Sequence, residues 1–376
     1  MIDFNQPYIA HNQEKYIKEA LESHHISGDG PFTKKCNHYL EEYFKVKKAL
    51  ITTNCTHALE MSAILLDLRE GDEVIVPSFT FVSTPNSFIL RGAKPVFIDI
   101  RPDTLNMDEN KLEELITDNT KAIYVVHYAG VGCEMDRILE IAQKYELDVV
   151  EDNAHGLFGK YKGKYLGTFG KFAAQSFHET KNISCGEGGA LLINDSSFIE
   201  RAEIIREKGT NRSRFFRGQI DKYSWVDIGS SFLPSDILAA ILLSHLEESQ
   251  NIQRKRREIW ENYDHALRGW THDNKVRQPF IPDHCEQSYH MYYLLLPDLD
   301  NRQAFIRHLK DRGVHAVFHY VPLHTSEMGK RYNYIEGSLP VTEDISDRLV
   351  RLPMFFDLSP NDLIKINNAV MDFKIV

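Results

Sequence analysis

The sequence has few of the features that mark secreted, membrane-spanning or nucleic-acid-binding proteins. Its start, Met1 to Pro7, has neither a basic region nor an apolar run, so we expect no signal peptide. No apolar run approaches the length of a membrane span, since the longest, around 238–246, contains Ser244 and His245. The 44 basic residues are outnumbered by 54 acidic ones, and this net charge of −10 argues against generic nucleic-acid binding.

Cysteine is scarce as well. The five cysteines are scattered, odd in number and without CxxC spacing, so we expect reduced thiols in a cytoplasmic protein and no metal site. The acidic total does not exclude a small anionic substrate, because local clusters of charge matter more than the sum. With 376 residues, 42% hydrophobic and 26% charged, the chain has the length and composition for one or two substantial cores.

Short apolar runs alternate with helix-like segments up to about residue 208. The runs are apolar throughout rather than alternating, as expected for strands covered on both faces. The sequence therefore predicts an α/β domain with a mostly parallel sheet. The predicted strands are 49–52, 73–76, 95–99, 122–126, 148–151, 172–177 and 190–193. The predicted helices are 13–24, one through residues 39–44, 58–68, 79–90, 108–116, 135–144 and 197–208.

The pattern changes near residue 247. A long charged helix at 247–267 contains the run Arg254 to Arg257, which neighbouring glutamates mark as a solvated face rather than a nucleic-acid site. Two strands and two helices follow, so we predict a large α/β domain at 1–246 and a smaller α+β domain at 247–376. The two later strands are expected at 291–296 and 316–320, and the two later helices at 302–312 and 363–373.

One lysine stands where an enzyme could hold a Schiff base. Lys181 lies in the stretch Ser176 to Asn182, between an apolar run and the glycine-rich turn Gly186 to Gly189. A solvated surface charge is the ordinary alternative for any single lysine. A catalytic role for Lys181 requires other side chains that could bind the same ligand. We look for them at the ends of the other strands, because ligands of α/β sheets gather at the carboxyl ends of strands.

Four such strand ends carry suitable side chains. Thr53 to His57, before a helix, could bind phosphate or form a plain N-cap. An aromatic residue in Pro77 to Thr84 could stack on a flat ring or belong to the core, and an acid in Glu151 to Gly156 could pair with a ring nitrogen or cap a helix. Ser176 and His178 could hold a phosphate and a ring oxygen, although a core histidine is the alternative. Together these are the parts of a pyridoxal phosphate (PLP) site in one chain order.

The same motifs resemble those of the DegT/DnrJ/EryC1/StrS sugar aminotransferases, over essentially the whole chain. The motifs are Pro77 to Thr84, Glu151 to His155 and Ser176 to Gly189. The resemblance implies a PLP-dependent transferase of fold type I, with a seven-stranded sheet and homodimers that share active sites. It implies that Lys181 forms the Schiff base, Asp152 pairs with the pyridine nitrogen, His155 supports the phenolic oxygen and Phe81 stacks on the ring. It places Cys55, Thr56 and Ser176 at the phosphate, with His178 close by.

A finer likeness is to the branch that makes dTDP-4-amino-4,6-dideoxygalactose. It rests on Gly28 to Gly30, Arg206 to Arg212, Phe216 to Ser231 and Val317 to His324. It implies amino transfer from L-glutamate to C4 of a dTDP-4-keto-6-deoxyhexose for surface polysaccharide synthesis. One position departs from the family: Ser231 stands where an asparagine usually reaches the partner's phosphate. The implied substrate-binding residues are Phe79, Lys208, Arg212, Arg214, Arg217, His319 and Tyr320.

Other functions stay open at this point. Some family members act at C3 of the sugar, and others dehydrate, although the dehydrating relatives carry histidine at the position of Lys181. A non-catalytic binding protein on the same fold is a further alternative. A nicotinamide enzyme is disfavoured, because no GxGxxG follows an early strand.

Overall fold

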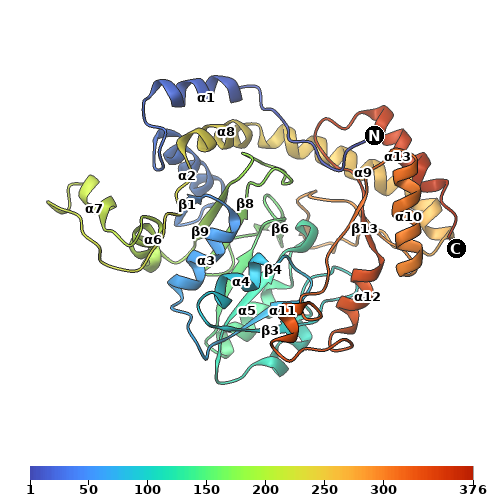
Figure 1. Ribbon diagram of the computed structural model, residues 1–376, viewed down its shortest axis with the longest axis horizontal. Helices are drawn as coiled ribbons and strands as arrows, with labels where there is room; N and C mark the ends of the chain where they lie inside the picture. Colours follow the sequence, from blue (N-terminus) through green and yellow to red (C-terminus); the bar gives the residue numbers. More distant parts are fainter. Residues whose placement is uncertain (376) are drawn as a thin grey trace.

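A computed structural model describes residues 1–375. Within them, a seven-stranded sheet forms the centre of the larger body (Figure 1), in the spatial order β1-β9-β8-β5-β4-β2-β3. All neighbouring pairs except those of β9 are parallel, since β9 runs antiparallel to both β1 and β8. This confirms the predicted mostly parallel, seven-stranded sheet. Its strands are β1 (Lys48–Thr52), β2 (Glu73–Pro77), β3 (Lys94–Ile98), β4 (Thr120–Val126), β5 (Asp148–Asp152), β8 (Phe172–Ser176) and β9 (Gly189–Ile193).

Helices cover both faces of this sheet, which explains the uninterrupted apolar strands. Leu191 packs on one face, with α3 (Cys55–Leu65), α4 (Ser83–Ile89) and α6 (Ile199–Arg206). Leu192, its neighbour in the chain, packs on the opposite face, because successive strand side chains point to opposite sides. The helices of that second face are α2 (Pro31–Phe44), α5 (Met135–Lys144) and α8 (Asp236–Glu247), with α1 (Gln13–Glu22) lying on α8.

The predicted helices differ from the structure at several places, including 108–116 and 236–247, while α7 (Arg212–Phe216), α11 (Glu327–Lys330) and α12 (Pro340–Arg348) were not predicted. The predicted helix at 108–116 is two short 3-10 turns, η1 (Glu109–Lys111) and η2 (Glu113–Leu115). Leu112 is its fully buried side chain, so the segment lacks the continuous apolar stripe that stabilises a longer helix. The sequence did not predict α8, because its side chains are buried almost all round and leave no polar face to reveal the helical period.

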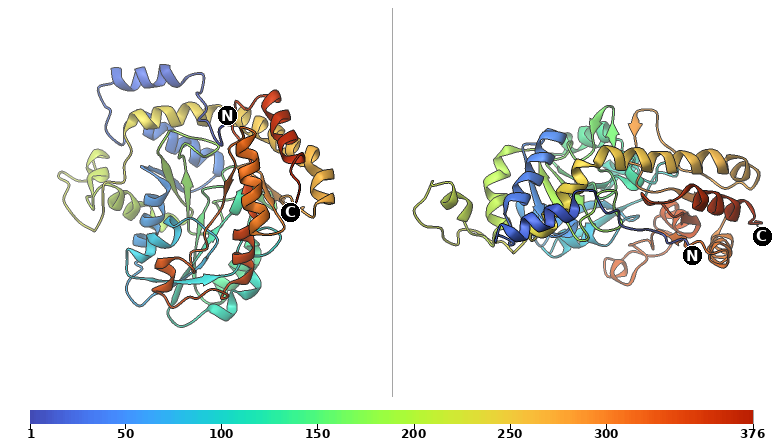
Figure 2. Two further views of the ribbon diagram at one scale, coloured as in Figure 1. Left: turned by 45° about the vertical axis from the view of Figure 1, so that its right-hand side comes forward. Right: turned by 90° about the horizontal axis from the view of Figure 1, so that it is seen from above.

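The smaller body is built on a three-stranded sheet, β11-β13-β12, covered by helices. Its core includes Tyr263, Leu294, Phe305 and Ile366. The proposed boundary near residue 247 falls where α8 gives way to α9, which runs along both bodies (Figure 2). The elements are α9 (Ser249–Asp273), β11 (Tyr293–Leu295), α10 (Leu299–Asp311), β12 (Val317–Phe318), α11 (Glu327–Lys330), α12 (Pro340–Arg348), β13 (Leu349–Arg351) and α13 (Pro360–Met371).

Two further segments of the chain cross from one body to the other. The Ile2 amide donates to the Gly313 carbonyl, and the His315 amide donates back to Ile2, so the amino end lies on the smaller body. In the other direction, β10 (Cys285–Glu286) pairs with β6 (Lys160–Tyr161), whose hairpin partner is β7 (Lys164–Tyr165), beside the larger body. Among the helices of the described chain, none has the length and apolar character to cross a membrane.

One segment leaves the compact part of the molecule. Residues 207–231, called the arm here, extend outward and carry α7 (Arg212–Phe216), at the left of Figure 1 and in both views of Figure 2. Large apolar side chains lie exposed on the arm, including Trp225, which is 78% exposed. Such a patch on a protruding segment is typical of a protein–protein contact.

Candidate active site

A cavity of about 490 Å³ opens at the carboxyl ends of β5 and β8. Its floor comes from the large sheet and the start of α3, and its far wall comes from the smaller body. The sheet side contributes the candidates Cys55, Thr56, Phe81, Asp152, His155, Ser176, His178 and Lys181. The other wall contributes His290, residues 318–321 and Arg351. The fold thus gathers predicted residues that are more than 120 positions apart in the sequence.

Lys181 follows β8 in a turn where its amide donates to the His178 carbonyl. Burial, with a smaller contribution from nearby Arg351, lowers the pKa of Lys181 to about 8, although Cys55 and Asp152 oppose the shift. A lysine with this pKa is unprotonated in a large fraction of molecules near pH 8, as a nucleophilic amine must be.

Asp152 is the last residue of β5 and is buried in the cavity floor. One carboxylate oxygen accepts a hydrogen bond from the Thr84 hydroxyl at 2.7 Å, and the other accepts from the Ala154 amide at 3.1 Å. Burial raises the pKa of Asp152, and these two donors oppose the shift. A cation placed against this carboxylate would stabilise its charged form further.

His155 offers the cavity a polar atom that lacks a protein partner. Its ring stacks on His290 with centroids 4.4 Å apart, and its Nδ1 is buried without a hydrogen bond to any described residue. Burial holds the pKa of His155 well below its usual value, so the ring is neutral. A buried nitrogen of this kind normally has a partner, so it fits a polar group of a bound cofactor.

The start of α3 provides an anion site on the other side. Asn54 caps the helix by accepting from the His57 amide, and the first helical residues, Cys55 and Thr56, line the cavity with amides that have no partner within the helix. The Thr56 hydroxyl lies 2.8 Å from that of Ser83. A Cβ at Gly189 would overlap the backbone of Asn54 and Cys55, so glycine is required where β9 approaches this turn.

The remaining wall residues divide between the cavity and the core. Phe81 is 57% exposed at the cavity, and His319 and Tyr320 line it from the smaller body. Phe79, predicted to bind substrate, is buried against Tyr128 and Tyr320 and does not line this cavity. Its position is therefore that of a support behind Tyr320.

Most of the other predicted substrate residues line a different cavity of about 750 Å³ at the base of the arm, whereas Arg214 lies in α7 and does not line it. Lys208, Arg212, Arg217 and Ser231 line it, and no described residue lines both this cavity and that of Lys181. The basic side chains are also paired within the chain. The pairs are Lys208–Glu207, Arg212–Glu207, Arg214–Glu200 and Arg217–Glu203. A single chain thus separates the two groups of predicted residues.

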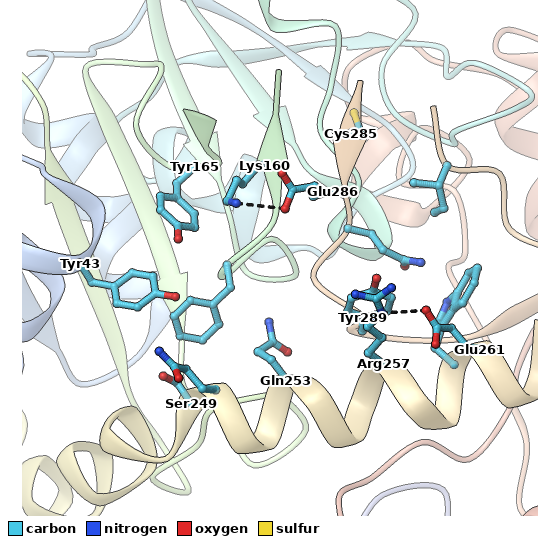
Figure 3. A pocket seen from close by; sticks show the side chains of 15 residues that line it. Tyr43, Lys160, Tyr165, Ser249, Gln253, Arg257, Glu261, Cys285, Glu286 and Tyr289 are labelled. Carbon is cyan, nitrogen blue, oxygen red and sulfur yellow. Dashed lines mark hydrogen bonds and ion pairs between the residues drawn. The ribbon is translucent and has the colours of Figure 1, made fainter. Parts of the chain in front are cut away.

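A third cavity, of about 720 Å³, lies between α9 and the β6–β10 strands (Figure 3). Its walls are aromatic and polar side chains such as Tyr43, Gln253 and Tyr289, and the drawn ion pairs are Lys160–Glu286 and Arg257–Glu261. None of the cofactor or substrate residues predicted from the sequence lines it. The Lys181 cavity is smaller than the other two, but it alone combines an amine of lowered pKa, a buried carboxylate and an anion site, among the cavities described here.

The sequence analysis missed two cavity residues with ionisable side chains, His290 and Arg351. Both lie more than 100 positions after Lys181, on segments of the smaller body. His290 precedes β11, and Arg351 ends β13, a strand that the sequence did not predict. No local motif surrounds either residue, so the packing of the two bodies was needed to find them.

The chain matches a known protein family over nearly its whole length. The model of the DegT/DnrJ/EryC1/StrS aminotransferase family matches residues 7–371. The chain is 34% identical to the uncharacterized protein MJ1066 of Methanocaldococcus jannaschii over 97% of its length and 95% of that protein. It is 32% identical to GDP-perosamine synthase of Escherichia coli O157:H7, covering 98% of this chain and 97% of that protein.

Solved structures agree in fold. The aminotransferase TlmJ from Streptoalloteichus hindustanus superimposes with a TM-score of 0.90 at 32% identity, covering 99% of this chain and 98% of that one. The Streptococcus pneumoniae protein Spr1654, solved in a PLP form, has a TM-score of 0.91 at 26% identity, covering 98% and 97% of the two chains.

Proposed function

The chain belongs to the DegT/DnrJ/EryC1/StrS aminotransferase family, and from this premise we propose that it transfers an amino group from L-glutamate to C4 of a dTDP-4-keto-6-deoxyhexose. It is a sugar aminotransferase with the fold of the type I PLP enzymes, and PLP is its cofactor. The observation that carries the proposal is the meeting of Lys181, Asp152 and the α3 anion site in one cavity.

The residues present fit this cofactor. The start of α3, with Thr56 and Ser83, suits its phosphate, and Ser176 and His178 lie at the same cavity. Asp152 would hold the pyridine nitrogen, and the unpartnered Nδ1 of His155 suits the ring oxygen. When bound, PLP supplies an aldehyde that condenses with amines and a ring that accepts the electrons of a broken C–H bond.

Lys181 would act first as the amine that anchors the cofactor and then, once released, as the proton carrier. Its Nζ would take the proton from the donor's α-carbon and deliver it within the same cavity. The lowered pKa of about 8 suits both directions, because general acid–base groups work best near the operating pH. The second half of the reaction uses the same groups in reverse order on the keto sugar.

Asp152 would keep a proton on the ring nitrogen throughout. Thr84 and the Ala154 amide fix the two oxygens of its carboxylate, so the charge is already oriented before any ligand arrives. His155 is held neutral by burial and is stacked on His290, so it can donate or accept at the ring oxygen without adding charge.

The arm supports a homodimer with shared sites. Its exposed Trp225, Phe216 and Tyr223 suit burial against a second copy. Lys208, Arg212, Arg214 and Arg217 would then serve the neighbouring cavity, where guanidinium groups suit the substrate's diphosphate. The basic side chains of the present glutamate pairs are 42–54% exposed, so a phosphate could reach them. Ser231 would donate a hydrogen bond across the same interface.

Two alternative sugar substrates are suggested, one by other members of the family and one by a relative of this chain. A C3-specific transaminase would use the same residues on a different keto sugar, and the relative named GDP-perosamine synthase adds a GDP-linked substrate. A non-catalytic binding protein is the remaining alternative, and the combination of Lys181 and Asp152 argues against it.

A substrate panel tests the proposal directly. The purified protein is incubated with L-glutamate and with dTDP-, UDP- and GDP-linked 3-keto and 4-keto sugars, and each product is identified by NMR. We expect an amine at C4 of the dTDP-4-keto-6-deoxyhexose, with the galacto configuration. An amine at C3, or a preference for another nucleotide, would overturn the finer assignment, and no turnover with any sugar would overturn the function.

A further inference from the structure

Asn182 follows Lys181 directly and is a buried amide that the functional assignment leaves without a role. It is 7% exposed, and its side chain reaches two other segments of the chain. Its Nδ2 donates to the Ser288 carbonyl at 2.7 Å and to Oε1 of Gln253, on α9, at 3.1 Å. Its Oδ1 lies 3.0 Å from Nδ1 of His290. One side chain therefore joins the turn of Lys181 to α9 and to the segment that precedes β11.

These contacts determine which nitrogen of His290 carries the ring proton. The Ser288 carbonyl can only accept a hydrogen bond, so the amide nitrogen of Asn182 faces it and the amide oxygen faces His290. Because an amide oxygen cannot donate, the proton between the two side chains belongs to Nδ1 of His290. The other ring nitrogen, Nε2, is then an acceptor, on a residue that lines the Lys181 cavity.

The surroundings of His290 also keep its ring neutral. The side chain is almost completely buried, and this burial holds the pKa of His290 well below its usual value. Four groups around the ring act in the same direction, namely His155, Lys181, Arg351 and Arg256. Asn182 accepts the ring proton without supplying a negative charge that would stabilise an imidazolium. His290 is therefore held as one neutral tautomer.

The groups that Asn182 holds are the supports of His155. The rings of His155 and His290 stack with centroids 4.4 Å apart and planes 19° from parallel. The Ser288 hydroxyl donates to the His155 carbonyl, and the Ser288 amide donates to the Gly130 carbonyl at 3.1 Å. Both the ring and the backbone of His155 thus rest on residues bound by Asn182. They orient the one buried ring nitrogen of His155, Nδ1, that has no hydrogen-bond partner among residues 1–375.

We propose that Asn182 is a positioning residue of the amino transfer, which acts through His290 to hold the neutral ring of His155 beside the ring oxygen of the cofactor. This inference rests on the proposed function, because that oxygen belongs to the PLP assigned to this cavity. An amide is required at position 182, since it binds the Ser288 carbonyl as a donor and the His290 ring as an uncharged acceptor. An aspartate of the same size would lose the donor and would stabilise an imidazolium at His290 instead.

The first measurement needs neither cofactor nor substrate. The histidines of the cofactor-free chain are labelled with the heavy nitrogen isotope, and the NMR signals of His290 are identified as those that His290→Gln removes. In the wild type we expect one ring proton, on Nδ1, from about pH 6 to about pH 8. In Asn182→Asp we expect both ring nitrogens to carry protons at about pH 6. A wild-type ring that carries its proton on Nε2, or that is charged at about pH 7, would contradict the inference.

The second measurement uses the PLP-loaded enzyme. Asn182→Asp should lower kcat about 30-fold and leave the KM values for L-glutamate and the keto sugar within about threefold, because the groups that bind the substrates are unchanged. The apparent pKa of the cofactor absorbance should fall by at least about half a unit, since the added positive charge at His290 lines the cavity and residue 182 does not. Asn367→Asp is the matched control and should change neither quantity. Asn367 is also 7% exposed and donates to an amide oxygen, that of Asn262, but it lies on α13 and does not line the cavity.

A double variant separates action through His290 from a direct effect on the neighbouring lysine. In the His290→Gln background, which has no ring to protonate, Asn182→Asp should change kcat by no more than about threefold. An equal loss in both backgrounds, or a rise in the absorbance pKa, would mean that residue 182 acts directly on Lys181, and the inference would be wrong.

The outcomes are distinguishable from failure of the function itself. The wild-type NMR spectrum covers the case in which Asn182→Asp does not fold, because it needs no change at position 182. If the wild type aminates a sugar but His290 carries its proton on Nε2, the inference alone fails and the proposed function stands. If the tautomer is as expected but no sugar is aminated, the proposed function fails, and the positioning role fails with it.

Discussion

The Lys181 cavity and the arm carry the two groups of predicted residues in contrasting ways. In the cavity, Asp152 is buried and fixed by Thr84 and a backbone amide before any ligand arrives. On the arm, Arg212 and Arg217 are exposed and paired with glutamates that a ligand could replace. A buried charge that is already oriented interacts strongly with a bound ligand, whereas an exposed charge is screened by solvent and salt and adds little to ligand binding. Single substitutions should therefore have large effects in the cavity and small ones on the arm.

The largest effect is expected from removing the amine of Lys181. Lys181→Ala should lower kcat at least about 10⁴-fold and abolish the imine absorbance, because both anchoring and proton transfer are lost. Lys181→Arg, which keeps a cation but cannot carry the proton at neutral pH, is the control and should be equally inactive. Turnover retained in either variant would contradict the role of Lys181.

The next effect tests the preorganised carboxylate. Asp152→Asn should lower kcat about 10²- to 10³-fold, because the ring nitrogen loses its anionic partner. Asp148→Asn, at the other end of β5 and paired with Lys171, is the matched control and should keep kcat within about twofold. Equal loss in both variants would show that the strand, rather than the charge in the cavity, is responsible.

The pH dependence of stability gives a third test of burial at Lys181. Its pKa is lowered to about 8 in the folded chain from an unfolded value near 10.5, so the unfolded state binds more protons between these pH values. This group therefore makes the free energy of unfolding of the cofactor-free chain rise with pH across that window. Lys181→Met should be more stable than the wild type below pH 8, by about 3 kcal/mol, and the difference should vanish above pH 10.5.

This third prediction is checked by urea denaturation of both chains at several pH values. A constant difference between Lys181→Met and the wild type from pH 7 to pH 10.5 would mean that the amine titrates normally and is not buried.

The smallest effects are expected on the arm. Arg212→Gln and Arg217→Gln should each raise the KM for the nucleotide sugar about tenfold and leave the KM for L-glutamate unchanged, because each removes one exposed phosphate contact. Arg254→Gln, on the exposed face of α9 and paired with Glu258, is the control. A change in the glutamate KM would place the arm at the donor site instead.

Mixed dimers sharpen the same comparison. Lys181→Ala is co-expressed with the double arm variant and assayed at a sugar concentration far below the KM of that variant. About a quarter of wild-type activity should be recovered, since half of a random mixture is hybrid and each hybrid has one intact site. No recovery would mean that cavity and arm act within one subunit.

Much of the cavity could be predicted from motifs close together in the chain. Asp152, Ser176 and Lys181 stand at or just after strand ends, and the carboxyl ends of parallel strands meet at one edge of a sheet. Phe79 shows the limit of this reasoning, because an aromatic residue two positions from Phe81 has the same local pattern but is buried behind Tyr320. Burial of one and exposure of the other depend on what packs above them.

By itself, the sequence determined the sheet, the order of its strands along the chain and the residues that end them, because apolar periodicity and turn residues are local properties. The tertiary structure alone decided that Arg351 and His290 face Lys181, and that the arm's arginines do not reach the same cavity within one subunit. Those placements depend on how the smaller body packs against the larger one. The residues concerned are far apart in the sequence, so no local sequence pattern can predict that they meet.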